Sequence, residues 1–201
     1  MARARGAWRA VRGSHIGRGD ALLVVDVQRD FLPGGTFSVP AGDEVIKPIN
    51  RFVSLFERAG LPIFYSRDWH PANHVSFKAR GGPWPRHCVA STEGAAFALT
   101  LRVPQGASII SKATTAERDA LSAFQETTLS SQLRAADVRR LYIGGLSTDY
   151  SVRATVLDAK REGFDVKVLT DAVRAVDVQP GDGQRALQEM QQFGAHLTSR
   201  C

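Results

Sequence analysis

The chain has 201 residues, of which 43% are hydrophobic, and a formal net charge of +6. This length and composition suit one globular domain with a core that needs no disulfide, and the two cysteines, Cys88 and Cys201, are too few for a disulfide framework. No segment resembles a transmembrane span or the apolar core of a secretory signal peptide, so the sequence predicts a cytoplasmic protein without a membrane partner.

The excess positive charge is concentrated near the N-terminus. Five arginines precede the first acidic residue of the chain: Arg3, Arg5, Arg9, Arg12 and Arg18. Without them, 21 of the 26 basic residues remain against 20 acidic ones, and they form no basic stripe of the kind that binds nucleic acid. Residues 1–19 are therefore predicted to be a disordered leader or a vector-derived tail, and residues 20–201 the folded domain.

Short apolar runs alternate with longer amphipathic segments along this domain. In chain order, the pattern predicts a strand at 21–27, a helix at 42–60, strands at 61–67, 107–112 and 137–145, a helix at 148–162, a strand at 164–171, a helix at 183–193 and a strand at 195–198. Such alternation favours right-handed crossovers and a largely parallel sheet covered on both faces. The predicted fold class is a single-domain, three-layer α/β/α fold with a doubly wound sheet.

Polar and ionisable residues stand at the predicted strand ends. They are Asp26, Asp68, His70, Lys112 and the glycine-rich turn over residues 144–151. Because ligands of open parallel sheets bind beyond the carboxyl ends of the strands, these groups are expected to meet at one edge.

Asp26 lies between valines in "LLVVDVQ", where an ionised carboxylate needs a cationic or hydrogen-bonding partner. Lys112, at the end of "SIISK", is the expected partner. A proton-accepting carboxylate next to an ammonium is the basic part of a nucleophilic triad without histidine. The alternative is that Asp26 caps a loop and Lys112 is a surface charge.

The segments "SRDWHPANHVSF" and "WPRHCV" contain residues of the kind that bind metals. They supply Asp68, His70, His87 and, as an optional fourth ligand, His74. Three protein ligands with open positions are typical of a catalytic metal, and nitrogen and oxygen donors without thiolate fit zinc, manganese or iron. The alternative is a set of polar loop residues that hold no metal.

Aromatic residues close to these groups could wall a pocket for a small planar ligand. Phe31 and Trp84 are candidates, while for Trp69 core packing is an equal alternative. Cys88 directly follows His87, and we interpret it as a small buried packing residue rather than a reactive thiol.

Five ordered blocks between residues 20 and 171 resemble the nicotinamidases, members of the isochorismatase-like cysteine hydrolase superfamily. The blocks are "VVDVQRDFLPGGTFSVPAGDEVI", "SRDWHPANHVSF", "GPWPRHCV", "SKATTAERDALSAF" and "GGLSTDYSVRATVLDA". The resemblance implies an isochorismatase-like fold and the hydrolysis of nicotinamide, a small amide of NAD metabolism, to nicotinate and ammonia. It also implies a triad of Asp26, Lys112 and position 151, and a cis peptide between Leu146 and Ser147. The N–H groups of Ser147 and residue 151 would then face the developing oxyanion.

The resemblance further implies one divalent metal ion that grips the pyridine nitrogen, with zinc expected and manganese or iron as alternatives. Its ligands would be Asp68, His70 and His87, with His74 added in some family members. Phe31 and Trp84 correspond to the aromatic walls of the ring pocket.

The chain departs from the family at the nucleophile. The family reads T-D-Y-C-V-R-A-T, whereas this chain reads T-D-Y-S-V-R-A-T with Ser151 in place of cysteine. A thiol with a pKa of roughly 8.5 readily becomes a thiolate, whereas a hydroxyl is far harder to deprotonate. We interpret Ser151 as an engineered replacement that preserves the pocket, traps substrate and largely stops turnover; a native serine is the alternative.

Three other functions stay open at this stage. An isochorismatase would tolerate serine, but such enzymes generally lack the metal ligands present here. Hydrolysis of other small amides would use the same chemistry, and a metal-dependent binding protein would recognise nicotinamide without cleaving it. A homo-oligomer is compatible with the sequence, since dimers are common among compact domains.

Overall fold

The computed structural model describes residues 16–199, so most of the predicted leader, together with Cys201, lies outside the described residues. The last part of that leader, residues 16–19, forms a turn into the first strand. The Gly17 N–H donates to Asp20 Oδ2 at 2.9 Å, and the Asp20 N–H donates to Gly17 O at 3.0 Å. Ile16 packs against the core, so these four residues belong to the folded unit.

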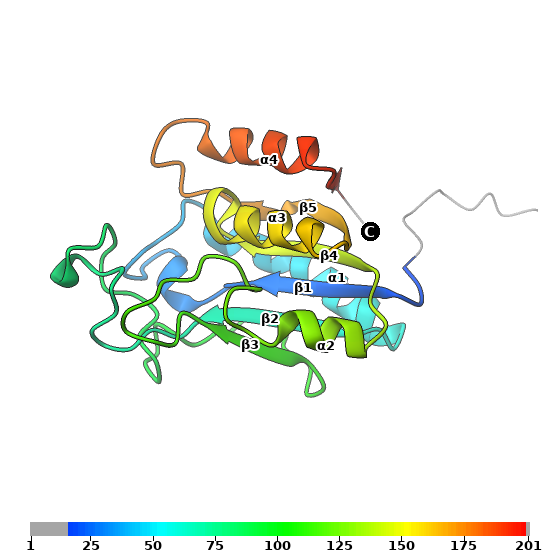
Figure 1. The fold of residues 1–201 in the computed structure, drawn as a ribbon, viewed down its shortest axis with the longest axis horizontal. Helices are drawn as coiled ribbons and strands as arrows, with labels where there is room; N and C mark the ends of the chain where they lie inside the picture. Colours follow the sequence, from blue (N-terminus) through cyan, green and yellow to red (C-terminus); the bar gives the residue numbers. More distant parts are fainter. Residues whose placement is uncertain (1–15, 200–201) are drawn as a thin grey trace, which may run out of the picture.

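The centre of the molecule is a six-stranded sheet with the order β3-β2-β1-β4-β5-β6 (Figure 1). The strands are β1 (Asp20–Val25), β2 (Ile63–Asp68), β3 (Ser108–Lys112), β4 (Arg140–Leu146), β5 (Asp165–Arg174) and β6 (His196–Thr198). Every neighbouring pair is parallel, and the chain reverses its direction of progress between β1 and β4. This confirms the predicted doubly wound sheet and places the expected ligand crevice beyond the carboxyl ends of these two strands.

Helices cover both faces of the sheet, which confirms the three-layer architecture (Figure 1). The helices are α1 (Ile46–Arg58), α2 (Leu129–Ala135), α3 (Arg153–Arg161) and α4 (Asp182–Gln192). In β1, Leu22 and Val24 share a core cluster with α1, whereas Leu23 and Val25 share one with the other three helices. A strand buried on both faces reads as a continuous apolar run, which is why "ALLVV" shows no alternation.

Four elements differ in detail from the prediction. The first predicted helix begins with a 3-10 turn over Gly42–Val45, and the second begins with a π-helical turn over Thr148–Val152 before α3 continues it. Helix α2 was not predicted, because seven residues are too few to display a helical period. Strand β5 extends to Arg174, past a register shift in its pairing with β4.

The helices of the described range are short. The longest, α1, has 13 residues, whereas a span of the bilayer needs about 20 apolar residues. Among residues 16–199, no helix combines the length and apolar character needed to cross a membrane.

A close approach of two strands fixes the turn that follows β4. Gly145 has a φ of +134°, and a Cβ added there would lie 2.0 Å from the carbonyl oxygen of Val25 in β1. Only glycine fits this position. The close contact brings the end of β4, and with it the turn that carries Ser151, next to the end of β1.

Candidate active site

Four strands deliver buried polar groups to one edge of the sheet. Asp26 follows β1 directly, Asp68 is the last residue of β2, and Lys112 is the last residue of β3. Strand β4 runs into the turn that leads to Ser151. All four side chains belong to buried residues, although three of them are charged or chargeable. The convergence predicted from the strand ends is thus what the structure shows.

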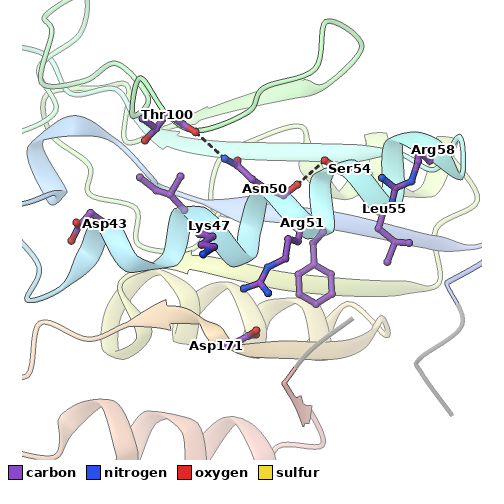
Figure 2. Close-up of a pocket in the computed structure, with 11 residues that line it drawn as sticks. Asp43, Lys47, Asn50, Arg51, Ser54, Leu55, Arg58, Thr100 and Asp171 are labelled. Carbon is purple, nitrogen blue, oxygen red and sulfur yellow. Dashed lines mark hydrogen bonds between the residues drawn. The ribbon is translucent and has the colours of Figure 1, made fainter. Parts of the chain in front are cut away.

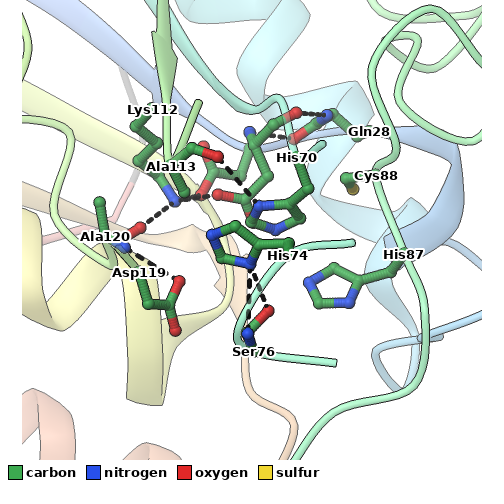
Figure 3. A network of polar contacts seen from close by, with 12 residues as sticks. Gln28, His70, His74, Ser76, His87, Cys88, Lys112, Ala113, Asp119 and Ala120 are labelled. Atoms are coloured by element: carbon green, nitrogen blue, oxygen red, sulfur yellow. Dashed lines mark hydrogen bonds and ion pairs between the residues drawn. The ribbon is translucent and has the colours of Figure 1, made fainter. Parts of the chain in front are cut away.

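Lys112 lies between two carboxylates in the interior (Figure 3). Its Nζ is 3.0 Å from Asp26 Oδ2, makes a shorter contact with Asp68 Oδ1, and donates to Ala120 O at 3.0 Å. The contacts with Asp68 Oδ1 and Ala120 O are hydrogen bonds, and the contact with Asp26 Oδ2 is an ion pair. The other oxygen of Asp26 accepts a hydrogen bond of 2.6 Å from the Ser66 hydroxyl. The alternative of a surface lysine is therefore wrong.

Burial and charge separate the acidities of the three groups. Burial raises the pKa of Asp26, and Lys112 offsets this only in part. Burial also raises the pKa of Asp68, but Lys112 and His70 outweigh it and hold that pKa below its usual range. Burial lowers the pKa of Lys112, yet its two carboxylate partners outweigh burial and raise it. Lys112 therefore stays charged, and Asp26 is the carboxylate that takes up a proton more readily.

Asp68, His70 and His87 each present one ligand atom within 4.8 Å of the others. The Nδ1 atoms of the two histidines lie against backbone carbonyls, His70 at 3.3 Å from Ala113 O and His87 at 2.7 Å from Pro85 O. If each Nδ1 carries the proton, each Nε2 offers a lone pair inward, which is the tautomer that metal-binding histidines use.

Two further observations fit a divalent cation at this position. His70 Nε2 is buried without a hydrogen-bond partner among the described residues, 3.6 Å from Asp68 Oδ2. Burial lowers the pKa of His87 and so favours the neutral ring that a metal requires. A cation bound by these three residues would satisfy the unpartnered nitrogen.

His74 lies beside this ligand set rather than in it. Its ring stacks on that of His70 with centroids 4.1 Å apart. Both of its nitrogens are already engaged. Nδ1 contacts the Ser76 hydroxyl at 2.8 Å (Figure 3), and Nε2 contacts Arg118 O at 2.9 Å. Spacing in the sequence could not show this, because Arg118 comes from a distant loop.

A pocket opens over the ligand set, and we call it the edge pocket. It is lined by Phe31, Phe37, Val39, Asp68, His70, Ser76, Trp84, His87, Asp119, Ala120, Leu121, Ser147, Tyr150, Ser151 and Val176. Ser151 thus faces the same space as Asp68 and the two histidines. Asp26 and Lys112 are buried behind this lining, where Lys112 contacts two of its residues, Asp68 and Ala120, and pairs with Asp26.

Aromatic side chains form the walls of the edge pocket. Phe31 and Trp84 were expected there, and two more join them. Phe37 lies 4.9 Å from Trp84, and Tyr150 meets Trp84 edge-on at 5.1 Å, both between ring centroids. Neither was predicted, because "GTFSVP" is a loop without periodicity and the sequence does not show that Tyr150 faces the pocket.

Two other predicted residues lie away from the lining. Trp69 stacks under the Arg67 guanidinium, 3.6 Å from ring centroid to Cζ, and packs against the α1-side core. Cys88 is a buried free thiol, and burial raises its pKa well above the usual value. Both are packing residues in this structure. This agrees with the packing alternative for Trp69 and with the predicted packing role of Cys88.

The turn before Ser151 has an unusual backbone. The peptide bond between Leu146 and Ser147 is cis. The carbonyl of Ser147 then accepts the N–H of Val152 at 3.0 Å, which closes the π-helical turn around Ser151. Ser151 is 7% exposed and sits at the start of the helical segment that continues as α3.

A wider hollow lies elsewhere, along α1, and we call it the α1 groove (Figure 2). It is lined by Asp43, Ile46, Lys47, Asn50, Arg51, Phe52, Ser54, Leu55, Arg58, Thr100 and Asp171. Its charged side chains are of both signs, and those of α1 are exposed. Since exposed charges interact weakly and unspecifically, the α1 groove lacks the converging buried groups that mark the edge pocket.

The chain is similar to proteins of known family. Residues 20–200 match the family model of the isochorismatase domain. The nicotinamidase of Escherichia coli is 38% identical over 198 residues, which cover 88% of this chain and 93% of that protein.

Solved structures agree. The pyrazinamidase of Pyrococcus horikoshii in complex with zinc superposes with a TM-score of 0.87 at 48% identity, covering 90% of this chain and 99% of the other. The yeast nicotinamidase bound to the inhibitor nicotinaldehyde gives a TM-score of 0.83 at 27% identity, with 90% and 100% of the two chains covered. By sequence and by fold, this chain belongs to the isochorismatase family.

Proposed function

We propose that this chain binds nicotinamide in the edge pocket and carries the residues that hydrolyse its carboxamide to nicotinate and ammonia. Its family and its named relatives make it a hydrolase of C–N amide bonds. The observation that carries the proposal is the buried cluster in which Lys112 joins Asp26 to Asp68, next to two histidines and below a pocket that contains Ser151.

One divalent cation, with zinc as the expected metal, would be held by Asp68, His70 and His87. When bound, it supplies a Lewis acid that grips the pyridine nitrogen and so orients the carboxamide. The zinc in the related pyrazinamidase supports this choice. Because both histidines orient their Nδ1 atoms toward backbone carbonyls, their Nε2 atoms are held in place for the ion before substrate arrives.

The aromatic walls would hold the planar ring. Phe31, Phe37 and Trp84 offer flat apolar surfaces around a few polar atoms, which is how small planar ligands are bound. Nicotinaldehyde, which binds the yeast relative, has the same pyridine ring.

Asp26 is the proposed general base and acid. It would accept the proton of the side chain at position 151 as that side chain attacks the amide carbon, and then pass the proton to the leaving ammonia. A water molecule would then attack the acyl group left on residue 151 and return a proton to that side chain, which releases nicotinate. Lys112 remains charged throughout, orienting Asp26 and stabilising its anionic form. The backbone N–H groups of Ser147 and residue 151 are the proposed donors to the oxyanion.

Ser151 limits this chemistry. In the resembled family the position is cysteine, whose thiol is acidic enough for a single buried carboxylate to deprotonate, whereas a serine hydroxyl is not. We therefore propose that the chain binds the amide, turns it over slowly and traps it, whether the serine was introduced or is native.

The experiment compares ammonia release from nicotinamide by the chain and by its Ser151→Cys variant, with zinc content measured in parallel. The proposal predicts one zinc per chain in both proteins and at least about 100-fold faster release by the variant. Bound zinc and nicotinamide with no ammonia from either protein would instead identify a binding protein. Release from maleamate or carbamoyl compounds, but none from nicotinamide, would reassign the substrate.

The compartment that we propose is the cytoplasm. Cys88 is a free thiol, and the chain has only two cysteines, which suits a reducing environment. There the reaction would return nicotinamide to pyridine nucleotide biosynthesis. Fractionation of cells that express the chain tests this placement.

A further inference from the structure

The backbone pairing between β1 and β2 stops one step before Asp68. The last ladder bond runs from the Asp26 N–H to Ser66 O at 3.2 Å. In a parallel ladder the next bond would join the Asp68 N–H to the carbonyl of Asp26. Asp26 instead has a φ of 50°, and its carbonyl accepts the N–H of Gln28 at 2.8 Å. The backbone of Asp68 is therefore left without its partner in β1.

The side chain of Gln28 takes the place of the missing strand. Its Oε1 accepts the Asp68 N–H at 2.8 Å, and its Nε2 donates to Asp68 O at 2.7 Å and to Ala95 O at 2.9 Å. Gln28 is fully buried. Because an unsatisfied amide in the interior is costly, both of its N–H donors and its carbonyl need the partners that they have here.

Asp68 has two tasks that depend on its orientation. Its Oδ1 contacts Lys112, and its Oδ2 faces His70 Nε2 at 3.6 Å. Since Asp68 is the last residue of β2, only its β3 side is held by regular pairing beyond Ser66. The amide of Gln28 holds both backbone groups of Asp68 from the opposite side.

We propose that Gln28 is a positioning residue of this site, which fixes Asp68 so that one carboxylate oxygen pairs with Lys112 and the other is available to the metal. This inference rests on the metal site of the proposed function. Gln28 does not line the edge pocket, so it acts through Asp68 and not on the substrate.

The chain contains a matched control for this contact. Asn50 in α1 also binds backbone groups with its amide. Its Nδ2 donates to Thr100 O at 2.8 Å (Figure 2), and its Oδ1 accepts the Arg102 N–H at 2.8 Å. This pair of hydrogen bonds lies at the α1 groove, away from the metal ligands. Loss of either amide removes backbone hydrogen bonds, but only the loss of Gln28 disturbs Asp68.

The test measures the zinc affinity of metal-stripped protein by competition with a chromophoric chelator, after circular dichroism has shown that each variant is folded. Gln28→Met, which keeps the side-chain length and removes all three bonds, is expected to bind zinc about 10- to 100-fold more weakly than the parent chain. Asn50→Leu is expected to bind within about twofold of the parent.

If Gln28→Met does not fold, Gln28→Asn, whose amide is one methylene too short to reach both groups of Asp68, is judged by the same criterion.

Two results would overturn the inference while leaving the proposed function intact: a folded Gln28→Met that binds zinc within twofold of the parent, or an equal loss in Asn50→Leu. A parent chain that binds no zinc would overturn the metal site of the proposed function, and the inference with it.

Discussion

The α1 groove and the edge pocket are hollows of opposite character. The α1 groove is the wider of the two, and the charged side chains that α1 presents to it lie in solvent. The edge pocket is narrower, but it is lined by the buried residues Asp68, His70 and His87, and behind them Lys112 pairs with both Asp68 and Asp26.

The difference shows that the width of a hollow does not identify its chemistry. Burying a charge costs free energy unless a partner of opposite charge is supplied, so a cluster of buried charged groups indicates a functional site. Exposed charged side chains such as those along α1 cost almost no free energy, so their presence does not indicate a functional site. Substitutions made in parallel in the two hollows test whether this contrast is real.

The largest expected effect comes from the lysine of the buried cluster. Lys112→Met leaves two carboxylates without their cation, and breaking such a buried pair typically costs about 3–5 kcal/mol of the free energy of unfolding. Urea denaturation of the metal-free protein measures it. Lys47→Met, the same exchange on the exposed face of α1, is expected to leave that free energy unchanged within error. Equal losses in the two variants would show that the buried cluster has no special role in stability.

Removal of a metal ligand has the next largest effect. In a Ser151→Cys background, His87→Ala is expected to lower ammonia release at least about 100-fold and to abolish stoichiometric zinc binding. In the Ser151→Cys protein with His87 intact, a chelator should lower ammonia release by the same factor, and added zinc should restore it. Arg51→Ala in the α1 groove should change neither quantity. Full activity of His87→Ala would assign the ligand role to another side chain.

The pH dependence of the Ser151→Cys variant reports on Asp26. Burial raises the pKa of this carboxyl above its ordinary value, so its neutral form persists to higher pH than that of an exposed aspartate. The neutral acid cannot accept the thiol proton. Activity is therefore expected to fall as the pH drops through the raised pKa, by about tenfold per pH unit below it. A rate that stays flat down to the ordinary pKa of an aspartate would exclude Asp26 as the base.

The smallest effect is expected from the aromatic wall. Trp84→Ala removes a ring that contacts Phe37 and Tyr150, and we expect the KM for nicotinamide to rise roughly tenfold with a smaller change in kcat. Steady-state kinetics in the Ser151→Cys background measure both. Leu55→Ala, in the α1 groove, should leave them unchanged. A fall in kcat alone would mean that Trp84 does not hold the bound ring.

Most of the fold follows from patterns within short segments. Continuous apolar runs such as "ALLVV" and the helix over α1 are local signals, so their order predicted a parallel sheet and its ligand edge. Helix α2 was not predicted, because its seven residues are too few to show a helical period; it is stabilised by the packing of Leu129 and Leu133 in the core.

Only those residues of the site that lie at strand ends, or whose residue type suggests a metal ligand, could be predicted from the sequence. Asp26 and Lys112 could be paired because each ends a buried strand, and the metal ligands because of their residue types. Gln28 could not be found, since its role depends on the left-handed turn at Asp26 that ends the ladder. The engagement of His74 by Arg118 O was equally hidden, because it joins residues 44 positions apart.

The most direct measurement is a crystal structure of the chain, with Ser151 in place, grown with zinc and nicotinamide. We predict an anomalous zinc signal bounded by Asp68, His70 and His87, with the pyridine nitrogen on the ion and the intact carboxamide carbon next to Ser151 Oγ. Zinc bound elsewhere, or nicotinamide seated in the α1 groove with the edge pocket empty, would contradict the assignment of the site.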